Sequence, residues 1–269
     1  MAGRDIFFLI LSLSFGSCRN LIDTSGITKN HLCSEQLHRI TELAFGKENT
    51  LEAFREMQGG YCNAVYQLEM KDRLQRVILK VAPSADVRLM SCETEMMRTE
   101  VEAMCLARKH QIPGVAKVYA YDDSRTICSG EYLLMEKLEG ESLSEAKQNM
   151  SDTEKEQADY RVGELLFQIN SVKGKKFGHF CVESLQYDNW FDAFYSMMSR
   201  IIHDGIDADI QIGVPYSQIL EQLTEYRDCF TEVTEPRLVH FDSWDGNILL
   251  RTDELAVLST GKGHFGPKA

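Results

Sequence analysis

The chain has 269 residues, 43% of them hydrophobic and 26% charged, and a formal net charge of −12. Such a composition is ordinary for a globular protein, and the length allows one large domain or two lobes. The acidic balance argues against nucleic-acid binding, which needs a basic surface, and is compatible with a cationic small substrate, although solubility is the commoner reason for an acidic surface. Eight cysteines without a C-x-x-C pair indicate reduced, mostly buried thiols rather than a zinc site or a disulfide framework.

The first 17 residues contain one basic residue, Arg4, and an apolar run over 6–15 that small residues follow. This arrangement is typical of a secretory signal, and the run is shorter than the roughly 20 apolar residues that span a bilayer. The free thiols and a nucleotide-site pattern downstream favour a cytoplasmic protein without a membrane partner. We therefore expect residues 1–26 to be an N-terminal extension, with export or an upstream extension of the reading frame as alternatives.

A helix and three strands are predicted before residue 82. Apolar residues at helical spacing predict a helix over 28–45. Alternating residues on both sides of Gly59-Gly60 predict a strand, a turn and a strand, and residues 77–81 form a third strand that contains Lys80. Two glycines let a backbone approach phosphate oxygens, and a lysine on the next strand supplies a charge for them. An ordinary hairpin turn and a surface lysine are the alternatives.

The next predicted helix spans residues 91–110 and has an apolar stripe that runs from Met97 to Cys105. A kinase lysine needs a glutamate on a helix to orient it. Glu100, which sits beside the stripe, is the candidate. Three other glutamates of this segment are not excluded by the spacing: Glu93, Glu95 and Glu102.

Two more strands are predicted over residues 115–121 and 132–140, and the second leaves through Glu136 and Leu138 into a loop at Gly140. In a two-lobed kinase this strand would be the hinge, whose backbone groups bind adenine. A core strand that ends at a glycine turn fits the same residues. From Ser142 on the pattern is helical, with helices predicted over 160–169, 190–202 and 216–230. This change places a lobe boundary near residue 140.

Residues 238–250 hold His240, Asp242 and Asn247 between two apolar runs. In a kinase catalytic loop a carboxylate accepts the proton of the acceptor hydroxyl, and an amide five residues on reaches the metal ion. Asp242 and Asn247 stand at that separation, and His240 is expected to brace the loop by packing or hydrogen bonding. The alternative is a hairpin that turns at Asp245-Gly246.

The glycine turn, Lys80, the hinge-like strand and His240-x-Asp242 occur in the order found in the aminoglycoside phosphotransferase family, which the chain resembles. That family shares the protein-kinase-like fold with choline and fructosamine kinases. The resemblance runs from about residue 27 to residue 250 and is most specific over 238–247. It implies a two-lobed α+β fold with an antiparallel-sheet, nucleotide-binding lobe over 27–140 and a mainly helical lobe over 141–269.

The resemblance also implies a reaction, in which the γ-phosphate of ATP moves to a hydroxyl of a small molecule, aminoglycoside-like or another metabolite. Asp242 and His240 would be the catalytic residues, and Asn247 would hold Mg²⁺. The residues expected to bind ATP are Gly59, Gly60, Asn63, Lys80, Glu100, Glu136 and Leu138.

The sequence departs from the family pattern after Leu250. The family continues with a segment whose aspartate is the principal magnesium ligand, and no aspartate occupies that place here. Asp253 follows Asn247 too closely to replace it. We therefore expect the C-terminal part of the fold to be missing, and the alternative function is a catalytically impaired pseudokinase or a truncated relic.

Overall fold

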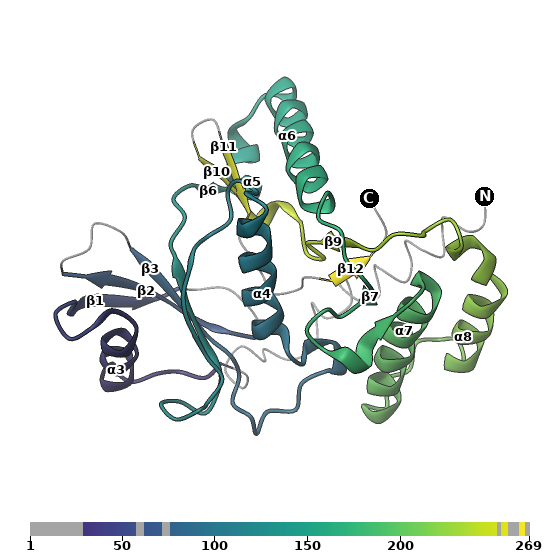
Figure 1. Cartoon of the computed structure of the whole chain (residues 1–269), viewed down its shortest axis with the longest axis horizontal. Coiled ribbons are helices and arrows are strands. Elements are labelled where there is room, and N and C mark those ends of the chain that lie inside the picture. The colour runs from purple at the N-terminus through teal and green to yellow at the C-terminus, as the bar shows by residue number, and fades with distance from the viewer. Residues whose placement is uncertain (1–28, 58–61, 72–75, 252–253, 258–263, 267–269) are drawn as a thin grey trace.

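The computed structural model describes residues 29–57, 62–71, 76–251, 254–257 and 264–266. Their helices and strands form two lobes that lie side by side (Figure 1). The N-terminal lobe holds an antiparallel sheet of five strands in the order β1-β2-β3-β5-β4. These strands are β1 (Leu51–Glu56), β2 (Ala64–Met70), β3 (Val77–Val81), β4 (Val118–Asp122) and β5 (Tyr132–Glu136).

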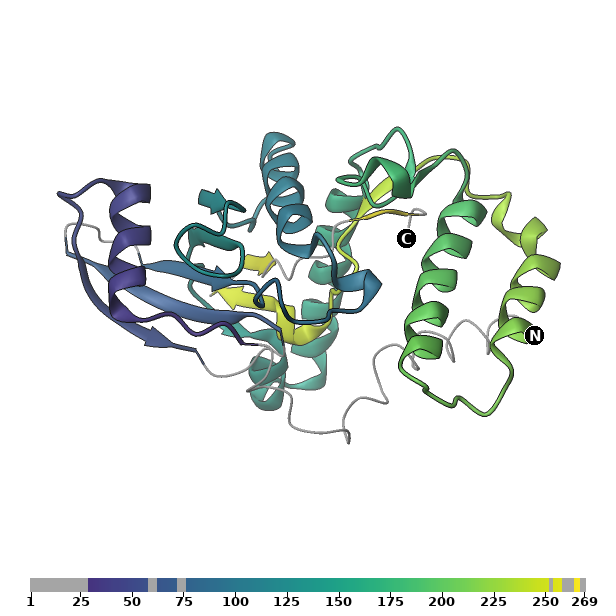
Figure 2. The same ribbon diagram turned by 90° about the horizontal axis from the view of Figure 1, so that it is seen from below.

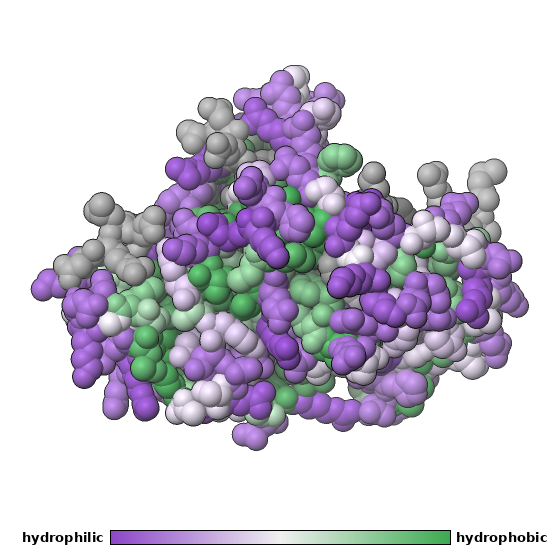
Figure 3. Space-filling model, viewed as in Figure 1, coloured by the Kyte–Doolittle hydropathy of each residue, from purple (hydrophilic) through white to green (hydrophobic). Residues whose placement is uncertain are grey.

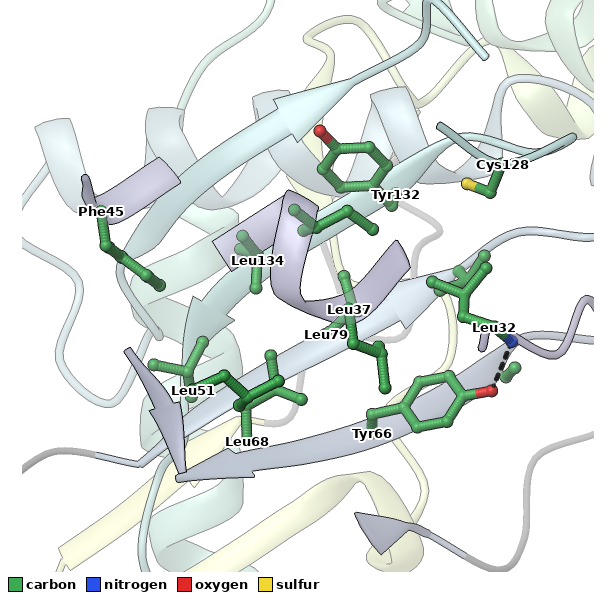
Figure 4. Close-up of a cluster of buried hydrophobic side chains, with 14 of the residues drawn as sticks. Leu32, Leu37, Phe45, Leu51, Tyr66, Leu68, Leu79, Cys128, Tyr132 and Leu134 are labelled. Atoms are coloured by element: carbon green, nitrogen blue, oxygen red, sulfur yellow. Dashed lines mark hydrogen bonds between the residues drawn. The ribbon is translucent and has the colours of Figure 1, made fainter. Parts of the chain in front are cut away.

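Two helices cover the opposite faces of this sheet, α3 (Ser34–Phe45) and α4 (Met96–Lys109). Successive strand side chains point to opposite faces. Accordingly Leu79 packs in one apolar cluster with residues of α3, whereas Ile78 packs in another with residues of α4. In the α3 cluster the hydroxyl of buried Tyr66 accepts a hydrogen bond of 2.9 Å from Leu32 N–H (Figure 4).

The C-terminal lobe is mainly helical and includes two small sheets. Its helices are α5 (Leu143–Ala146), α6 (Asp152–Asn170), α7 (Trp190–Asp207) and α8 (Tyr216–Glu225). One sheet has the order β11-β10-β6, with β11 (Glu254–Val257), β10 (Ile248–Arg251) and β6 (Glu141–Ser142). The other has the order β8-β7-β12-β9, with β8 (Gln186–Tyr187), β7 (Phe177–Gly178), β12 (His264–Gly266) and β9 (Arg237–Val239). The predicted α+β architecture is confirmed.

Three predicted helices are shorter in the structure or divided there. The first begins at Ser34, because the Gln36 side chain accepts a hydrogen bond from Cys33 N–H (2.9 Å) in a capping box. The helix predicted over 91–110 is divided: a 3₁₀ turn, η2 (Ser91–Glu93), precedes α4, and Glu95 between them has a φ of 58°. The helix predicted over 216–230 ends at Glu225 and is followed by the 3₁₀ turn η5 (Arg227–Phe230).

The expectation that most cysteines are buried is wrong. Of the seven described cysteines, only Cys128 is buried. Cys33 caps a helix, Cys92 lies in a 3₁₀ turn and Cys105 is exposed on α4, so these three occupy surface positions.

Hydrophilic residues dominate the visible surface over α6 (Figure 3). None of the helices in the described ranges is long and apolar enough to cross a membrane, and the signal-like residues 1–17 lie outside those ranges.

The segment between β5 and β6 joins the two lobes and passes close to β10. Gly140 in this segment has a φ of 142°, and a Cβ atom there would lie 2.8 Å from the carbonyl oxygen of Leu250. A side chain at this position would therefore force the two backbones apart. Ser142 of β6 pairs with Leu249 of β10, so the joining segment fixes the strand that follows Asn247.

Candidate active site

Lys80 and Glu100 form a buried ion pair between β3 and α4. Lys80 Nζ lies 2.6 Å from Glu100 Oε1, and the side chains are 11% and 1% exposed. Lys80 follows Ile78 by two residues and therefore lies on the α4 face of the sheet. On α4, Glu100 lies between the buried residues Met97 and Met104 at helical spacing, which directs its carboxylate toward β3.

The other three candidate glutamates have different partners. Glu93 accepts hydrogen bonds from the N–H of Met90 (3.0 Å) and the thiol of Cys62 (3.6 Å). Glu95 and Glu102 are exposed, and each pairs with Arg98 on the outer side of α4. Of the four glutamates that the spacing left open, Glu100 is the one that contacts Lys80.

The predicted glycine turn lies between β1 and β2, and Gly59 and Gly60 themselves are outside the described residues. The flanking strands pair antiparallel, with Glu56 opposite Tyr66, as the strand-turn-strand pattern predicts. Asn63 directly precedes β2, and in that strand Val65 pairs with Lys80 of β3. The pairing therefore places the chain that leaves the turn next to the Lys80–Glu100 pair.

Glu136 and Leu138 lie where β5 leaves the sheet. Glu136 N–H donates to the carbonyl of Lys117 (2.8 Å), and the Glu136 carboxylate accepts from Lys117 N–H (3.0 Å). Leu138 packs with Ile78 and Val65 in the apolar cluster on the α4 face. Leu138 thus places an apolar side chain near the end of β5, on the face of the sheet that carries Lys80.

The segment from His240 to Asp242 is a tight turn. Asp242 N–H donates to the carbonyl of His240 at 2.8 Å, and Phe241 between them has a φ of 61°. A hydrogen bond from residue i+2 to residue i around a positive φ is rare and strained, and strain of this kind is concentrated at functional sites. The turn redirects the chain as it leaves β9, which brings Asp242 out of the strand.

Asn247 fixes Asp242 through two hydrogen bonds. Its Nδ2 donates to the Asp242 backbone oxygen (2.8 Å) and to Asp242 Oδ2 (3.0 Å), and its side chain is buried. Asn247 ends a 3₁₀ turn, η6 (Asp245–Asn247), and the strands on either side belong to different sheets. The alternative of a hairpin at Asp245-Gly246 is therefore wrong.

Lys147 is a contact of this loop that sequence reasoning missed. Its Nζ lies 2.8 Å from Asp245 Oδ2 and 2.6 Å from Asp159 Oδ1 of α6. The pKa of Lys147 lies above its ordinary value: burial lowers it, but the hydrogen bonds to Asp159 and Asp245 outweigh that effect. Lys147 precedes Asp245 by 98 residues, so no local pattern in the sequence points to this pair.

Asn247 is the residue of this loop that was expected to hold a magnesium ion. Since Asn247 Nδ2 faces Asp242, the amide oxygen Oδ1 points away from that residue and has the chemistry of a magnesium ligand. Within the described ranges, no group of three His, Cys, Asp or Glu residues could hold a metal ion. Asn247 Oδ1 would supply one oxygen ligand to such an ion, and phosphate oxygens and water would supply the others.

Comparison with known proteins identifies relatives of this fold. A structure described as a fructosamine-3-kinase from Haemophilus somnus 129PT is 16% identical, with a TM-score of 0.60 and coverage of 87% of this chain and 74% of that one. Aminoglycoside phosphotransferase APH(4)-Ia is 14% identical, with a TM-score of 0.59 and coverage of 88% and 74%. The streptomycin–ATP ternary complex of APH(2")-IIa is 14% identical, with a TM-score of 0.58 and coverage of 88% of this chain and 74% of that one. Among curated proteins, nothing matches the sequence.

The sequence model of the phosphotransferase enzyme family matches residues 53–258, which include Lys80, Glu100, Asp242 and Asn247. The matched residues make up more than half of the chain. The solved relatives share the antiparallel-sheet lobe and the helical lobe of the protein-kinase-like fold. This chain therefore belongs to the phosphotransferase enzyme family.

Proposed function

We propose that this protein transfers the γ-phosphate of ATP to a hydroxyl group of a small molecule. The buried Lys80–Glu100 pair is the observation that carries the proposal. A lysine held by a helix glutamate is the device by which kinases position ATP phosphates. An ion pair taken out of water stabilises a fold little compared with apolar residues of similar volume, so its presence favours a functional reason.

The remaining nucleotide contacts are assigned to the same face of the sheet. The backbone of Glu136 and Leu138 would bind adenine, with Leu138 and Val65 against the ring. Gly59, Gly60 and Asn63 would border the phosphates. This assignment is supported by relatives that were crystallised with ATP or an ATP analogue.

Asp242 is proposed to orient the acceptor hydroxyl and to take its proton. The turn at Phe241 and the two hydrogen bonds from Asn247 hold its carboxylate in one orientation, as positional catalysis requires. His240 supports this turn through its carbonyl oxygen. Asn247 Oδ1 would hold Mg²⁺, which neutralises phosphate charge when it is bound.

The acceptor is proposed to be a polyhydroxylated amine. Relatives in this fold include an aminoglycoside phosphotransferase crystallised with hygromycin B and a protein described as a fructosamine-3-kinase. The net charge of −12 favours a cationic acceptor of this type through its long-range field.

Transfer of labelled phosphate from ATP to a panel of aminoglycosides and fructosamines tests the proposal. Asp242→Asn, which keeps the shape of the side chain, should lower turnover by about 10²-fold or more while ATP affinity changes little. Ser243→Ala, an exposed neighbour in the same loop, is the control and should behave as the parent protein. Transfer that survives in Asp242→Asn would contradict the role of Asp242.

A nucleotide-binding pseudokinase is the second candidate function. One feature of the sequence favours it: after Leu250 no aspartate occupies the place where the resemblance puts the principal magnesium ligand. This candidate predicts ATP binding that Mg²⁺ does not strengthen and no transfer to any acceptor in the panel. Magnesium dependence therefore separates the two candidates.

A further inference from the structure

Helix α7 of the C-terminal lobe forms hydrogen bonds with the segment that leads into α4. Asp204 Oδ2 accepts hydrogen bonds from Ser91 N–H (2.8 Å) and from the Ser91 hydroxyl (2.6 Å). Arg200, one turn earlier on α7, donates to the carbonyl of Ser91 and to the hydroxyl of Thr94 (3.4 Å). We call Ser91, Thr94, Arg200 and Asp204 the α7 clasp. The ribbon before α4 reaches α7 in both views (Figures 1 and 2).

The clasp surrounds a backbone turn that starts α4. Glu95 at the N-terminal cap has a φ of 58°, a region that non-glycine residues avoid. Such a conformation persists where neighbouring contacts fix it from several sides. Thr94 Oγ1 donates to the carbonyl of Ser91 (2.9 Å), and Thr99 Oγ1 donates to the carbonyl of Glu95 (2.7 Å). Together with Arg200, these bonds set the direction in which α4 leaves the turn.

A second contact from the C-terminal lobe reaches the same helix. His179, which directly follows β7, is buried, and its Nε2 lies 3.1 Å from Thr99 Oγ1. The Thr99 hydroxyl already donates to Glu95, so Oγ1 accepts from His179 Nε2–H. Thr99 directly precedes Glu100 on α4. The part of α4 that carries Glu100 is therefore held on one side by Lys80 and on the other by the C-terminal lobe.

We propose that Arg200 and Asp204 are positioning residues for the Lys80–Glu100 pair. They hold the start of α4 so that Glu100 meets Lys80, and they tie this pair to the lobe that carries Asp242. The inference rests on the proposed function and deepens it, because it names residues outside the nucleotide site that set its geometry. A broken clasp should leave the protein folded but should separate Glu100 from Lys80 for part of the time.

The chain supplies a matched control for the clasp. Asp207, three residues after Asp204 on α7, pairs with Arg88 (3.1 Å) in the segment just before η2. Both of these side chains are exposed, at 64% and 75%, and solvent screens such a pair. Asp207→Ala therefore removes a carboxylate from the same helix without loosening α4. Asp204→Asn keeps an oxygen that can accept from Ser91 and is expected to preserve the clasp.

The first test uses the unliganded protein and does not depend on nucleotide binding. The rate of reductive methylation of Lys80 is measured by mass spectrometry, together with amide hydrogen exchange of residues 96–109. Asp204→Ala should raise both rates, the first by about fivefold to tenfold, which is the size of couplings between contacting groups. Asp207→Ala and Asp204→Asn should match the parent protein. If Asp204→Ala does not fold, Ser91→Ala takes its place as the test variant. Ser91→Ala removes one of the two hydrogen bonds between Ser91 and Asp204.

The second test asks whether the clasp acts through Glu100. The dissociation constant of ATP is measured for the parent protein, Asp204→Ala, Glu100→Gln and the double variant. In the parent protein, Asp204→Ala should weaken ATP binding about tenfold. In the protein that already carries Glu100→Gln, the same substitution should weaken it less than about twofold, because both changes break the same contact. A general loosening of the fold would instead give additive effects.

Three results overturn the inference. Asp204→Ala that behaves as Asp207→Ala in the unliganded protein would show that the clasp does not hold α4. Additive effects on ATP affinity would show that it does not act through Glu100. Both leave the proposed function standing. A parent protein that binds no ATP would overturn the proposed function, and this inference with it.

Discussion

Lys80 Nζ and Glu100 Oε1 lie 2.6 Å apart, and the contact joins the central strand of the sheet to the helix that the C-terminal lobe holds. Both side chains are almost completely buried. Because Lys80 pairs in register with Leu133 of β5, which continues into the segment between the lobes, this one contact lies at the junction of three elements. Any nucleotide bound on this face would be positioned by it.

Glu100→Gln should weaken ATP binding and destabilise the fold. The substitution leaves a lysine charge buried without its carboxylate, and the loss of one partner from a buried pair costs about 3–5 kcal/mol. Glu102→Gln, on the exposed side of the same helix, should change stability by less than about 0.5 kcal/mol. Urea denaturation and ATP titration of both variants check this. Equal behaviour of the two variants would contradict the role given to Glu100.

Phe241→Gly should be more stable than Phe241→Ala. Both variants lose the ring, but only glycine adopts a φ of 61° without strain, and a non-glycine residue there costs roughly 1–2 kcal/mol. At ordinary positions alanine is the more stable of the two by about 0.4–1 kcal/mol. We therefore expect the free energy of unfolding from urea denaturation to be higher for Phe241→Gly than for Phe241→Ala, by about 1 kcal/mol. If alanine is ahead, the turn at Phe241 is not as the structure has it.

Gly140→Ala should destabilise the protein by about 2 kcal/mol, because both its φ of 142° and the nearby Leu250 oxygen oppose a Cβ atom. Gly163 in α6 has nothing within 4 Å of the position of a Cβ atom. Gly163→Ala should therefore stabilise its helix by about 1 kcal/mol. Thermal unfolding of the two variants should shift in opposite directions. A loss of stability in both would remove the argument for close approach at Gly140.

The pH dependence of stability should contain a contribution from His179. Burial lowers its pKa, and the charges of Arg200 and Arg98 lower it further. The unfolded chain, whose histidines titrate near pH 6.5, then binds more protons than the folded one as the pH falls. The free energy of unfolding should therefore fall between about pH 7.5 and about pH 5.5, and fall less in His179→Gln. Identical pH profiles would show that His179 is not buried in its neutral form.

Local patterns in the sequence predicted much of the site. Lys80 lies in an apolar strand and Glu100 beside an apolar helix stripe, so local patterns made both residues candidates, although the spacing left three other glutamates open. Asp242 and Asn247 are five residues apart, and their contact is a property of one loop. The strand-turn-strand pattern was equally local, and so was the start of the helical lobe.

Contacts between distant segments could not be predicted in this way. Ser91 and Asp204 are 113 residues apart. No local pattern in the sequence indicates that an aspartate on one helix accepts a hydrogen bond from the segment that precedes another helix. The break in the helix predicted over 91–110 lies next to residues that α7 contacts, Ser91 and Thr94. Lys147 was missed because its partner Asp245 lies in a loop that only the fold brings near.

Thermal unfolding of the parent protein with ATP, with and without Mg²⁺, tests the central claim most directly. A ligand at about 100 times its dissociation constant stabilises the folded state by roughly 2.7 kcal/mol. We expect ATP to raise the unfolding temperature, Mg²⁺ to increase that shift, and Asn247→Ala to abolish the increase. A folded protein whose unfolding temperature ATP does not change, with or without Mg²⁺, would contradict the account.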